Sequence, residues 1–355
     1  MAMPRKRRTT RQIEDLPGLF DAIDIDMTRN DIAGDIIEQQ QKKEQARRTG
    51  TDMRPDSGMD LNPQSLQRPE AVRFISFGSG SSGNCAYIGT SEGGLLIDAG
   101  VDNKVVEKRL AENGIDMRTI SAILLTHDHS DHVHYAYTLL RANRHLQLLC
   151  TPRTLNGLLR RHSISRRITD YHKAIYKEFP FQAGGFTVTA FETSHDGSDN
   201  VGFAIDRGDH HFVVTTDTGF ITERADYYMR RATYLMLESN YDADMLRRGR
   251  YPEYLKARIQ GQRGHMDNAD SAAYVERLLN DAGSDNRLTH LFLCHLSQDN
   301  NTPQLALDAM SRAIAATGHT IGDASGSPAA LAADIQLMAL PRYDASPLFI
   351  FRSKM

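Results

Sequence analysis

Three histidines and two aspartates lie within six consecutive positions, from His127 to His132. They follow directly on the apolar run Ile123-Leu124-Leu125, which is typical of a buried strand. Side chains that follow such a strand lie at the edge of its sheet, in a loop that a rigid scaffold positions. Imidazole and carboxylate groups together suit zinc, manganese or iron and need no thiol. The segment therefore predicts a metal site, in preference to a solvated polar loop.

Three later positions show the same arrangement, in which an apolar run ends in a ligand-type residue. These residues are His195 after residues 185–192, Asp217 after residues 212–214, and His295 after residues 291–293. Each of them alone would be interpreted as a capping or hydrogen-bonded polar residue. Together with the cluster at residues 127–132, they predict a site that several strand ends share. A second metal ion would need these additional ligands.

The elements that must position these residues come as two blocks of strands, each accompanied by helices. The apolar patterns predict strands at residues 72–77, 86–88, 94–97, 120–125, 146–150, 175–179, 185–192, 201–206, 212–216, 234–237, 291–294, 335–340 and 348–351. They predict helices at residues 103–113, 135–143, 152–161, 221–231 and 303–316, with two or three more within 243–279. This arrangement fits two sheets packed face to face with helices outside.

Length and composition indicate an ordinary globular protein. The chain has 355 residues, of which 40% are hydrophobic and 25% charged. The net charge of −3 gives no overall attraction to nucleic acid or to anionic membranes, so such attraction must be local. The sequence has no apolar run near the roughly 20 residues of a membrane helix, and no signal peptide is expected. Three widely spaced cysteines (Cys85, Cys150 and Cys294) predict no disulfide framework and favour a reducing cytoplasm.

Residues 1–68 differ from the rest of the chain, which we expect to form one hydrolase domain at residues 69–355. They contain a basic start, a polar helical stretch at residues 28–48, and a linker rich in Pro, Ser, Asp and Gln. The apolar stripe of the helical stretch is too narrow for a core, so we predict a largely disordered tail with one short helix. The alternative is a tether, because five basic residues among the first eleven could contact a phosphate backbone.

The chain resembles the metallo-β-lactamase superfamily from about Val72 to its C-terminus. The residues that carry this resemblance are, in order, Asp98, His127-x-His129-x-Asp131-His132, His195, Asp217 and His295. More closely, the chain is similar to the YycJ/VicX (WalJ) metallo-hydrolases. The features shared with them are Phe77-Gly78-Ser79-Gly80-Ser81-Ser82-Gly83-Asn84, Leu237-Glu238-Ser239-Asn240, Gly264-His265 with Asn268, and His295-Leu296-Ser297 with Asn300-Asn301. The resemblance implies an α+β fold, an αββα sandwich of two mixed sheets flanked by helices, with metals at the edge between the sheets.

The resemblance also implies how two divalent metal ions are held. His127, His129 and His195 would bind the first ion, Asp131, His132 and His295 would bind the second, and Asp217 would bridge them. Asp98 would fix the orientation of a ligating side chain. Zinc, manganese and iron all remain open as the metal, because this ligand set accepts each of them.

Asp217 restricts the chemistry that the resemblance implies. An aspartate at this position accompanies phosphodiesterases and thioesterases of the superfamily, and the β-lactam hydrolases lack it. The implied reaction is attack on phosphorus by a hydroxide that bridges the two metal ions, with Asp131 orienting it or receiving its proton. His265 lies where related phosphodiesterases such as RNase Z place a histidine that binds no metal, and it would protonate the leaving group. A structural histidine beside Gly264 is the alternative.

The similarity to the YycJ-like proteins implies exonuclease activity on DNA from the 5′ end, so DNA is the favoured substrate. An RNA nuclease and a phosphodiesterase for small cyclic or other nucleotides are the alternatives. A thioesterase is less favoured, because residues 296–355 predict one helix and two short strands where a glyoxalase II-like enzyme carries a helical domain. Residues 218–294 leave no room for the β-CASP insertion of RNase J-type nucleases. A regulatory module without turnover is opposed by the intact ligand set.

Candidate substrate contacts are Ser81, Asn84, Asn240 and Asn268. The first two belong to the glycine-rich turn at residues 78–84, for which a purely structural turn is the alternative. Five arginines before His265 could bind phosphates or could form a solvated helix face: Arg247, Arg248, Arg250, Arg258 and Arg263. Tyr241 and Asp267 depart from the family pattern, in which histidine and serine are common. These departures leave the substrate assignment open and the metal site unaffected.

Overall fold

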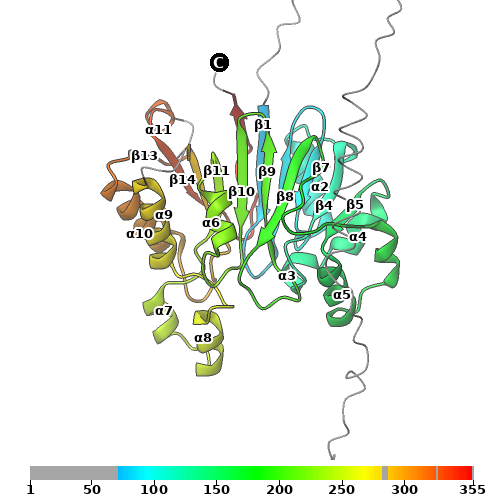
Figure 1. The fold of residues 1–355 in the computed structure, drawn as a ribbon, viewed down its shortest axis with the longest axis horizontal. Coiled ribbons are helices and arrows are strands. Elements are labelled where there is room, and N and C mark those ends of the chain that lie inside the picture. The colour runs from blue at the N-terminus through cyan, green and yellow to red at the C-terminus, as the bar shows by residue number, and fades with distance from the viewer. Residues whose placement is uncertain (1–70, 282–286, 325–326, 354–355) are drawn as a thin grey trace, which may run out of the picture. The chain divides into compact units, whose positions relative to one another are not determined.

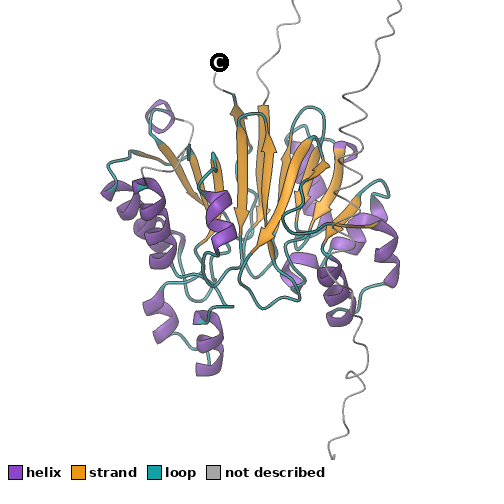
Figure 2. Cartoon of the chain, in the orientation of Figure 1, coloured by secondary structure: helices purple, strands orange, loops and turns teal. Residues whose placement is uncertain are grey.

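The computed structural model describes residues 71–281, 287–324 and 327–353. The tail predicted at residues 1–68 lies outside these residues. Within the described ranges, two β-sheets lie at the centre and helices lie on either side of them (Figures 1 and 2). No helix in these ranges is both long enough and apolar enough to span a bilayer.

The first sheet has seven strands in the order β15-β1-β2-β3-β4-β5-β6. The strands are β1 (Ala71–Gly78), β2 (Cys85–Gly89), β3 (Gly94–Ile97), β4 (Ile120–Leu124), β5 (Gln147–Cys150), β6 (His172–Ala174) and β15 (Phe349–Arg352). Strands β3 to β6 are parallel, whereas β15, β1, β2 and β3 pair antiparallel. The carboxyl ends of β3 and β4 therefore meet at one edge of the sheet.

The second sheet has eight strands in the order β13-β14-β12-β11-β10-β9-β8-β7. The strands are β7 (Phe181–Ala183), β8 (Phe186–Glu192), β9 (Val201–Arg207), β10 (His210–Thr215), β11 (Tyr234–Glu238), β12 (His290–Cys294), β13 (Ile321–Gly322) and β14 (Ile335–Ala339). Strands β10, β11, β12 and β14 are parallel. Because β9 pairs antiparallel with both β8 and β10, β8 runs in the same direction as β10. The carboxyl ends of β8, β10, β11 and β12 therefore share one edge.

Helices cover the outer faces of the two sheets, and the two helices within residues 243–260 extend beyond the sheet edge (Figure 1). They are α2 (Asn103–Glu112), α3 (Ser130–Val133), α4 (Ala136–Ala142), α5 (Pro152–Arg161), α6 (Glu223–Met229), α7 (Ala243–Arg248), α8 (Glu253–Gln260), α9 (Asn268–Asn280), α10 (Pro303–Ala316) and α11 (Pro328–Leu331), with 3₁₀ turns at Met117–Thr119 and Arg166–Tyr171. In Figure 1, α4 and α5 lie on the side of the first sheet and α9 and α10 on the side of the second. Side-chain caps begin several helices; for example, Thr151 caps α5, which has Pro152 in its first turn.

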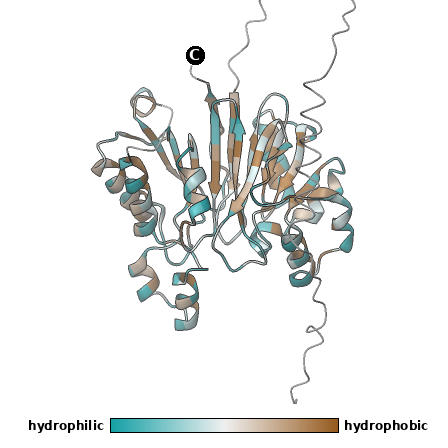
Figure 3. Cartoon of the chain, viewed as in Figure 1, coloured by the Kyte–Doolittle hydropathy of each residue, from teal (hydrophilic) through white to brown (hydrophobic). Residues whose placement is uncertain are grey.

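Three layers of buried apolar side chains hold the sandwich together. The layer between the sheets includes Phe74, whose ring centroid lies 4.7 Å from that of Phe212 and 5.0 Å from that of Phe292. The other two layers join each sheet to its helices. The strands accordingly carry much of the hydrophobic surface, and polar residues are common on the helices (Figure 3). Burial on both faces explains the continuous apolar runs that precede the site residues.

The predicted αββα sandwich of the α+β class is confirmed. The prediction of a strand at residues 175–179 is wrong, because β6 ends at Ala174 and β7 begins at Phe181. In this segment the chain passes from the first sheet to the second, and Glu178 adopts a left-handed backbone with φ of 66°. Ile175 is buried, whereas Tyr176 is 58% exposed. These residues therefore form a connection between the two sheets, and the apolar contact that holds it is the buried side chain of Ile175.

Candidate metal centre

The predicted ligands lie at strand ends that converge at one edge of the two sheets. The first sheet contributes the segment after β4. The second sheet contributes His195 after β8, Asp217 after β10 and His295 after β12. Two of these residues have left-handed backbones, with φ of 48° at Asp217 and 54° at His295, and Asp98 after β3 has φ of 60°. Non-glycine residues adopt such angles at a cost, and they cluster at functional sites. The sharp turn at each strand end aims the side chain along the edge.

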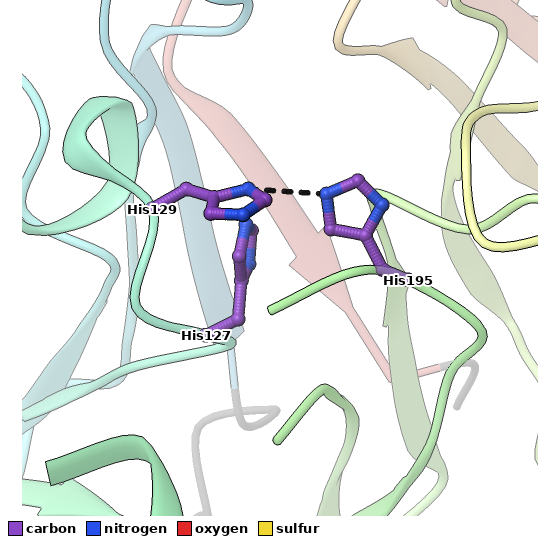
Figure 4. Close-up of side chains that lie close together, drawn as sticks. All are labelled: His127, His129 and His195. Atoms are coloured by element: carbon purple, nitrogen blue, oxygen red, sulfur yellow. Dashed lines mark hydrogen bonds between the residues drawn. The ribbon is translucent and has the colours of Figure 1, made fainter. Parts of the chain in front are cut away.

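His127, His129 and His195 form one group, shown in Figure 4. The ring centroids of His127 and His129 are 4.6 Å apart, and His129 Nδ1 lies 3.2 Å from His195 Nε2. One ring nitrogen from each residue lies within 4.8 Å of the others. The rings therefore point toward one another across the boundary between the first sheet, which carries two of them, and the second sheet, which carries the third.

Asp131, His132 and His295 form a second group beside the first. Asp131 Oδ2 lies 3.5 Å from His132 Nε2 and 3.4 Å from His295 Nε2. The helix α3 begins at Ser130, inside the predicted loop, and carries Asp131 and His132. The two groups adjoin, because the ring centroids of His127 and His132 are 4.1 Å apart. The change from extended to helical backbone thus divides one short segment between two groups of ligand-type side chains.

Asp217 lies between the two groups. Its Oδ2 atom is 3.3 Å from His132 Nε2, and its Oδ1 atom is 3.6 Å from His195 Nε2 and 3.4 Å from His295 Nδ1. The side chain is buried, which disfavours its charged form, yet the imidazoles of His295 and His132 hold the pKa of Asp217 well below its usual range. A carboxylate that remains ionised between two groups of imidazoles can accept two cations at once.

Each histidine of these two groups is held through the ring nitrogen that faces away from the others. The contacts are His127 Nδ1 with Thr126 Oγ1 (3.0 Å), His129 Nε2 with Asp196 Oδ1 (3.2 Å), His132 Nδ1 with Asp98 Oδ2 (2.7 Å), His195 Nδ1 with the Gly264 carbonyl (2.9 Å) and His295 Nδ1 with Glu238 Oε1 (2.9 Å). In a neutral ring, a hydrogen bond of this kind fixes the tautomer and the orientation and leaves the second nitrogen with a lone pair. The contact of His129 with Asp196 is within ion-pair distance but is not a hydrogen bond. The structure thus places Asp98 against His132, in the kind of position expected for it.

His127 provides a direct test of whether a metal ion fits these residues. The side chain is 1% exposed, and its Nε2 atom has no hydrogen-bond partner among the described residues. Burial holds the pKa of His127 well below its usual range and lowers that of His195 to about 4, so both rings are neutral. A buried neutral nitrogen without a partner is costly unless something binds its lone pair. A divalent cation meets this requirement, and the donor set fits zinc, manganese or iron.

Replacing Asp98 with asparagine should weaken metal binding by roughly 10–100-fold, because the ring of His132 loses the carboxylate that orients it. Metal content after dialysis against graded chelator concentrations measures this change. Asp102→Asn is the matched control: Asp102 caps α2, and asparagine caps a helix equally well. Equal metal affinity in Asp98→Asn and the wild type would contradict the positioning role.

Glu238, at the end of β11, is a site residue that the sequence reasoning did not assign. Its Oε1 atom accepts hydrogen bonds from His295 Nδ1 (2.9 Å) and His265 Nδ1 (2.7 Å), while Oε2 accepts one from the Thr218 N–H (2.8 Å). One buried carboxylate therefore orients a candidate ligand and the candidate proton donor together. Because His265 Nδ1 is engaged, the other nitrogen of this 19%-exposed ring remains for a substrate.

Of the four candidate substrate contacts, Ser81 is exposed and the three asparagines are buried. Asn84 Nδ2 lies 3.2 Å from Asp131 Oδ2, and Asn240 Nδ2 donates to the His295 carbonyl at 2.7 Å. Asn268 accepts a hydrogen bond from Ser239 Oγ at 2.7 Å. These contacts tie the asparagines to the site from inside the protein. The glycine-rich turn also reaches the site, since Ser79 Oγ accepts a hydrogen bond from the His295 N–H at 2.9 Å.

The five candidate arginines divide into two sets. Arg258 Nε donates to Asp196 Oδ2 at 2.6 Å, and Arg263 Nε donates to the His195 carbonyl at 3.1 Å, so both lie beside the His195 loop. The other three are on or after α7, where Arg247 pairs with Asp244 on its own helix and Arg248 and Arg250 line a separate pocket. Of the five arginines, the structure brings only Arg258 and Arg263 to the metal centre.

The metal centre opens to solvent through a pocket of about 330 Å³. Its lining includes two candidate ligands, His129 and Asp131, and three basic residues, Arg161, His162 and Arg258. Arg161 Nε lies 3.4 Å from Asp128, the buried residue between the first two histidines. A pocket that joins metal ligands to guanidinium groups suits an anionic substrate.

Known proteins are similar to this chain in sequence and in fold. A family model for the beta-lactamase superfamily domain matches residues 94–287. The chain belongs to the metallo-β-lactamase superfamily. Among solved structures, the metallo-beta-lactamase fold protein YhfI from Bacillus subtilis is 17% identical to this chain. It superposes with a TM-score of 0.56, over 79% of this chain and 100% of YhfI. That likeness shows the fold.

Two curated superfamily relatives are more similar in sequence. The exodeoxyribonuclease YycJ from Bacillus anthracis is 33% identical over 254 residues, which cover 71% of this chain and 93% of the relative. The exodeoxyribonuclease WalJ from Streptococcus pneumoniae is 32% identical over 251 residues, which cover 70% of this chain and 91% of the relative. The predicted membership of the superfamily, and the similarity to YycJ and WalJ within it, are confirmed.

Proposed function

We propose that this protein is a two-metal phosphodiesterase that degrades DNA as an exonuclease from the 5′ end. The observation that carries the proposal is the position of Asp217, whose carboxylate lies within 3.6 Å of imidazole nitrogens from both histidine groups. Its two oxygens can serve two cations held by His127, His129 and His195 on one side and by Asp131, His132 and His295 on the other. Bound there, two divalent cations would activate water and neutralise charge on a phosphate oxygen.

The remaining chemistry follows from side chains around the pocket. Asp131 is 19% exposed in the opening, where its carboxylate can orient an attacking water and accept a proton. Arg161 and Arg258 line the same opening and can bind the phosphate oxygens that do not react. His265, oriented by Glu238, can deliver a proton to the departing oxygen. Attack and departure are thus assigned to different residues.

The choice of DNA is supported by the relatives. YycJ and WalJ are both named exodeoxyribonucleases, and this chain covers more than nine tenths of each. The exposed arginines beside the metal centre are consistent with a polyanionic substrate, although the net charge of the whole chain is −3. RNA and small cyclic nucleotides share the phosphodiester group, so they are the substrates against which DNA must be compared.

Chelation should abolish hydrolysis and destabilise the protein. A ligand at about 100 times its Kd stabilises the folded state by roughly 2.7 kcal/mol per site, so stripping two ions should lower the midpoint of thermal unfolding. The assay uses the full chain, treated with a chelator and then reloaded with zinc or manganese. Its substrates are 5′-labelled duplex DNA, the same sequence as RNA, and a cyclic nucleotide. Reloading should restore mononucleotide release from the 5′ end of DNA.

Asp131→Ala serves as the inactive control in the same assay. If the reloaded protein leaves DNA intact but consumes RNA or the cyclic nucleotide, the DNA assignment is wrong. If no phosphodiester is cleaved with either metal while a thioester is, the phosphodiesterase proposal itself is wrong. A ladder of shortened products that keep the 5′ label would show degradation from the 3′ end and would overturn the direction.

A further inference from the structure

A second pocket, of about 390 Å³, lies directly beside the metal centre. Its wall contains His195, so the candidate ligand separates this pocket from the metal site. The remaining wall comes from the start of α5, the loop between β8 and β9, and the segment that leads into α6. Neither the metal ions nor the proposed proton transfer uses this pocket. We therefore considered which part of a substrate it could bind.

The basic residues of this pocket differ in how they are engaged. Lys177 lies 2.7 Å from Asp199 and 3.6 Å from Glu192, so its charge is balanced. Arg153 is exposed and makes no hydrogen bond or ion pair within the described part of the chain. Arg263 uses its Nε atom to bind the His195 carbonyl, and its guanidinium carries further N–H donors. Two guanidinium groups thus remain to bind an anion.

The pocket also contains an exposed aromatic ring. Phe220, just before α6, is 46% exposed, although a phenyl ring has no polar group to gain from contact with water. The nearby hydroxyls are already committed: Ser194 Oγ donates to the Gln262 carbonyl at 2.8 Å, and Thr222 Oγ1 donates to the Glu192 carbonyl at 2.8 Å. Asn200 Oδ1 is buried and has no hydrogen-bond partner among the described residues, so it is a free acceptor in the lining. The pocket therefore offers mainly guanidinium groups and an aromatic face.

We propose that this pocket binds one unpaired nucleotide of the strand that is being cleaved. Arg153 and Arg263 bind its phosphate, and its base stacks on Phe220. Stacking on an aromatic ring, combined with cationic contacts to the backbone, is how proteins bind single strands without sequence preference. Because the pocket shares His195 with the metal centre, this nucleotide is adjacent to the phosphodiester that reacts. The inference rests on the proposed function and adds one property of the substrate. The end of the strand that is cleaved is unpaired when the protein binds it.

The test compares Arg153→Ala and Phe220→Ala with Arg141→Ala, a matched exposed arginine on α4 that lies outside both pockets. Affinity for a fluorescein-labelled single-stranded oligonucleotide is measured by anisotropy as a function of salt. The protein is metal-loaded, and the oligonucleotide has phosphorothioate linkages to slow cleavage. Each pocket variant should weaken binding about tenfold. Arg153→Ala should also reduce the slope of log affinity against log salt by about one unit, which a purely structural defect would not do. Arg141→Ala should bind as the wild type does.

Two further measurements keep the outcomes distinct. Loss of affinity should be larger for the single strand than for a blunt duplex of the same sequence; equal losses would overturn stacking on an unpaired base. If the wild type degrades DNA while Arg153→Ala and Phe220→Ala bind and degrade it unchanged, the pocket assignment is wrong and the proposed function stands. If the wild type degrades no nucleic acid but the variants lose affinity, the proposed function fails and the binding pocket stands.

Discussion

Replacing Asp217 with asparagine should leave a folded protein that binds fewer than two metal ions and hydrolyses phosphodiesters at least roughly 10³-fold more slowly than the wild type. The side chain keeps its shape but loses the charge that lies between the two histidine groups, 3.3 Å from His132 and 3.6 Å from His195. Two cations held close together repel each other, and a bridging carboxylate offsets this repulsion. Elemental analysis of the purified variant gives the stoichiometry, and DNA degradation gives the rate.

The control for this substitution is Asp206→Asn. Asp206 lies on the same sheet, in β9, and its carboxylate contacts His211 on the surface, far along the strand from the site. That variant should retain two metal ions and wild-type activity. Two ions per chain in Asp217→Asn, with a rate within tenfold of the wild type, would show that the carboxylate does not bridge.

Replacing His265 with glutamine should lower kcat on DNA by about 10²–10⁴-fold while leaving the bound metal unchanged. The loss should be much smaller for bis(p-nitrophenyl) phosphate, whose leaving group is stable as an anion and needs no proton. The contrast between the two substrates isolates proton donation, because a misfolded or metal-depleted site would affect both alike. The prediction follows from the geometry of His265, whose Nδ1 atom is held by Glu238 at 2.7 Å.

Glu238→Gln separates the two roles of that carboxylate. It should reduce kcat in the same substrate-dependent way as His265→Gln, and it should also weaken metal binding by roughly 10–100-fold, because Glu238 holds His295. Equal losses on both substrates in His265→Gln would show that the histidine acts on binding or structure. Loss of metal from His265→Gln would instead make it a ligand.

Much of the site could be predicted because its chemistry is concentrated in a few residue types at strand ends. The cluster at residues 127–132 stands out on its own, and the remaining candidates follow from one rule, an apolar run that ends in a ligand-type residue. Glu238 obeys the same rule after Tyr234-Leu235-Met236-Leu237, so the sequence also carries a signal for this residue.

Other features had no signal in the sequence. The Gly264 carbonyl anchors His195, and a backbone carbonyl is present at every position, so residue type could not indicate it. The segment at residues 175–179 looks like a strand because Ile175, Tyr176 and Phe179 are residue types that favour strands, yet its path is set by the need to join two sheets. The family resemblance indicates the asparagines of the site, but the side of the site from which they act depends on tertiary packing.

The left-handed backbones at Asp98, Asp217 and His295 each carry a conformational cost of roughly 1–2 kcal/mol. Glycine would remove that cost, but it would also remove side chains that bind or orient the metal ions, and it would add entropy to the unfolded chain. Because bound metal stabilises the folded state, the net effect of such a substitution should depend on whether metal is present. A laboratory selection for heat resistance in the presence of a chelator should therefore relax the constraint on these three positions, whereas the same selection with metal supplied should retain them.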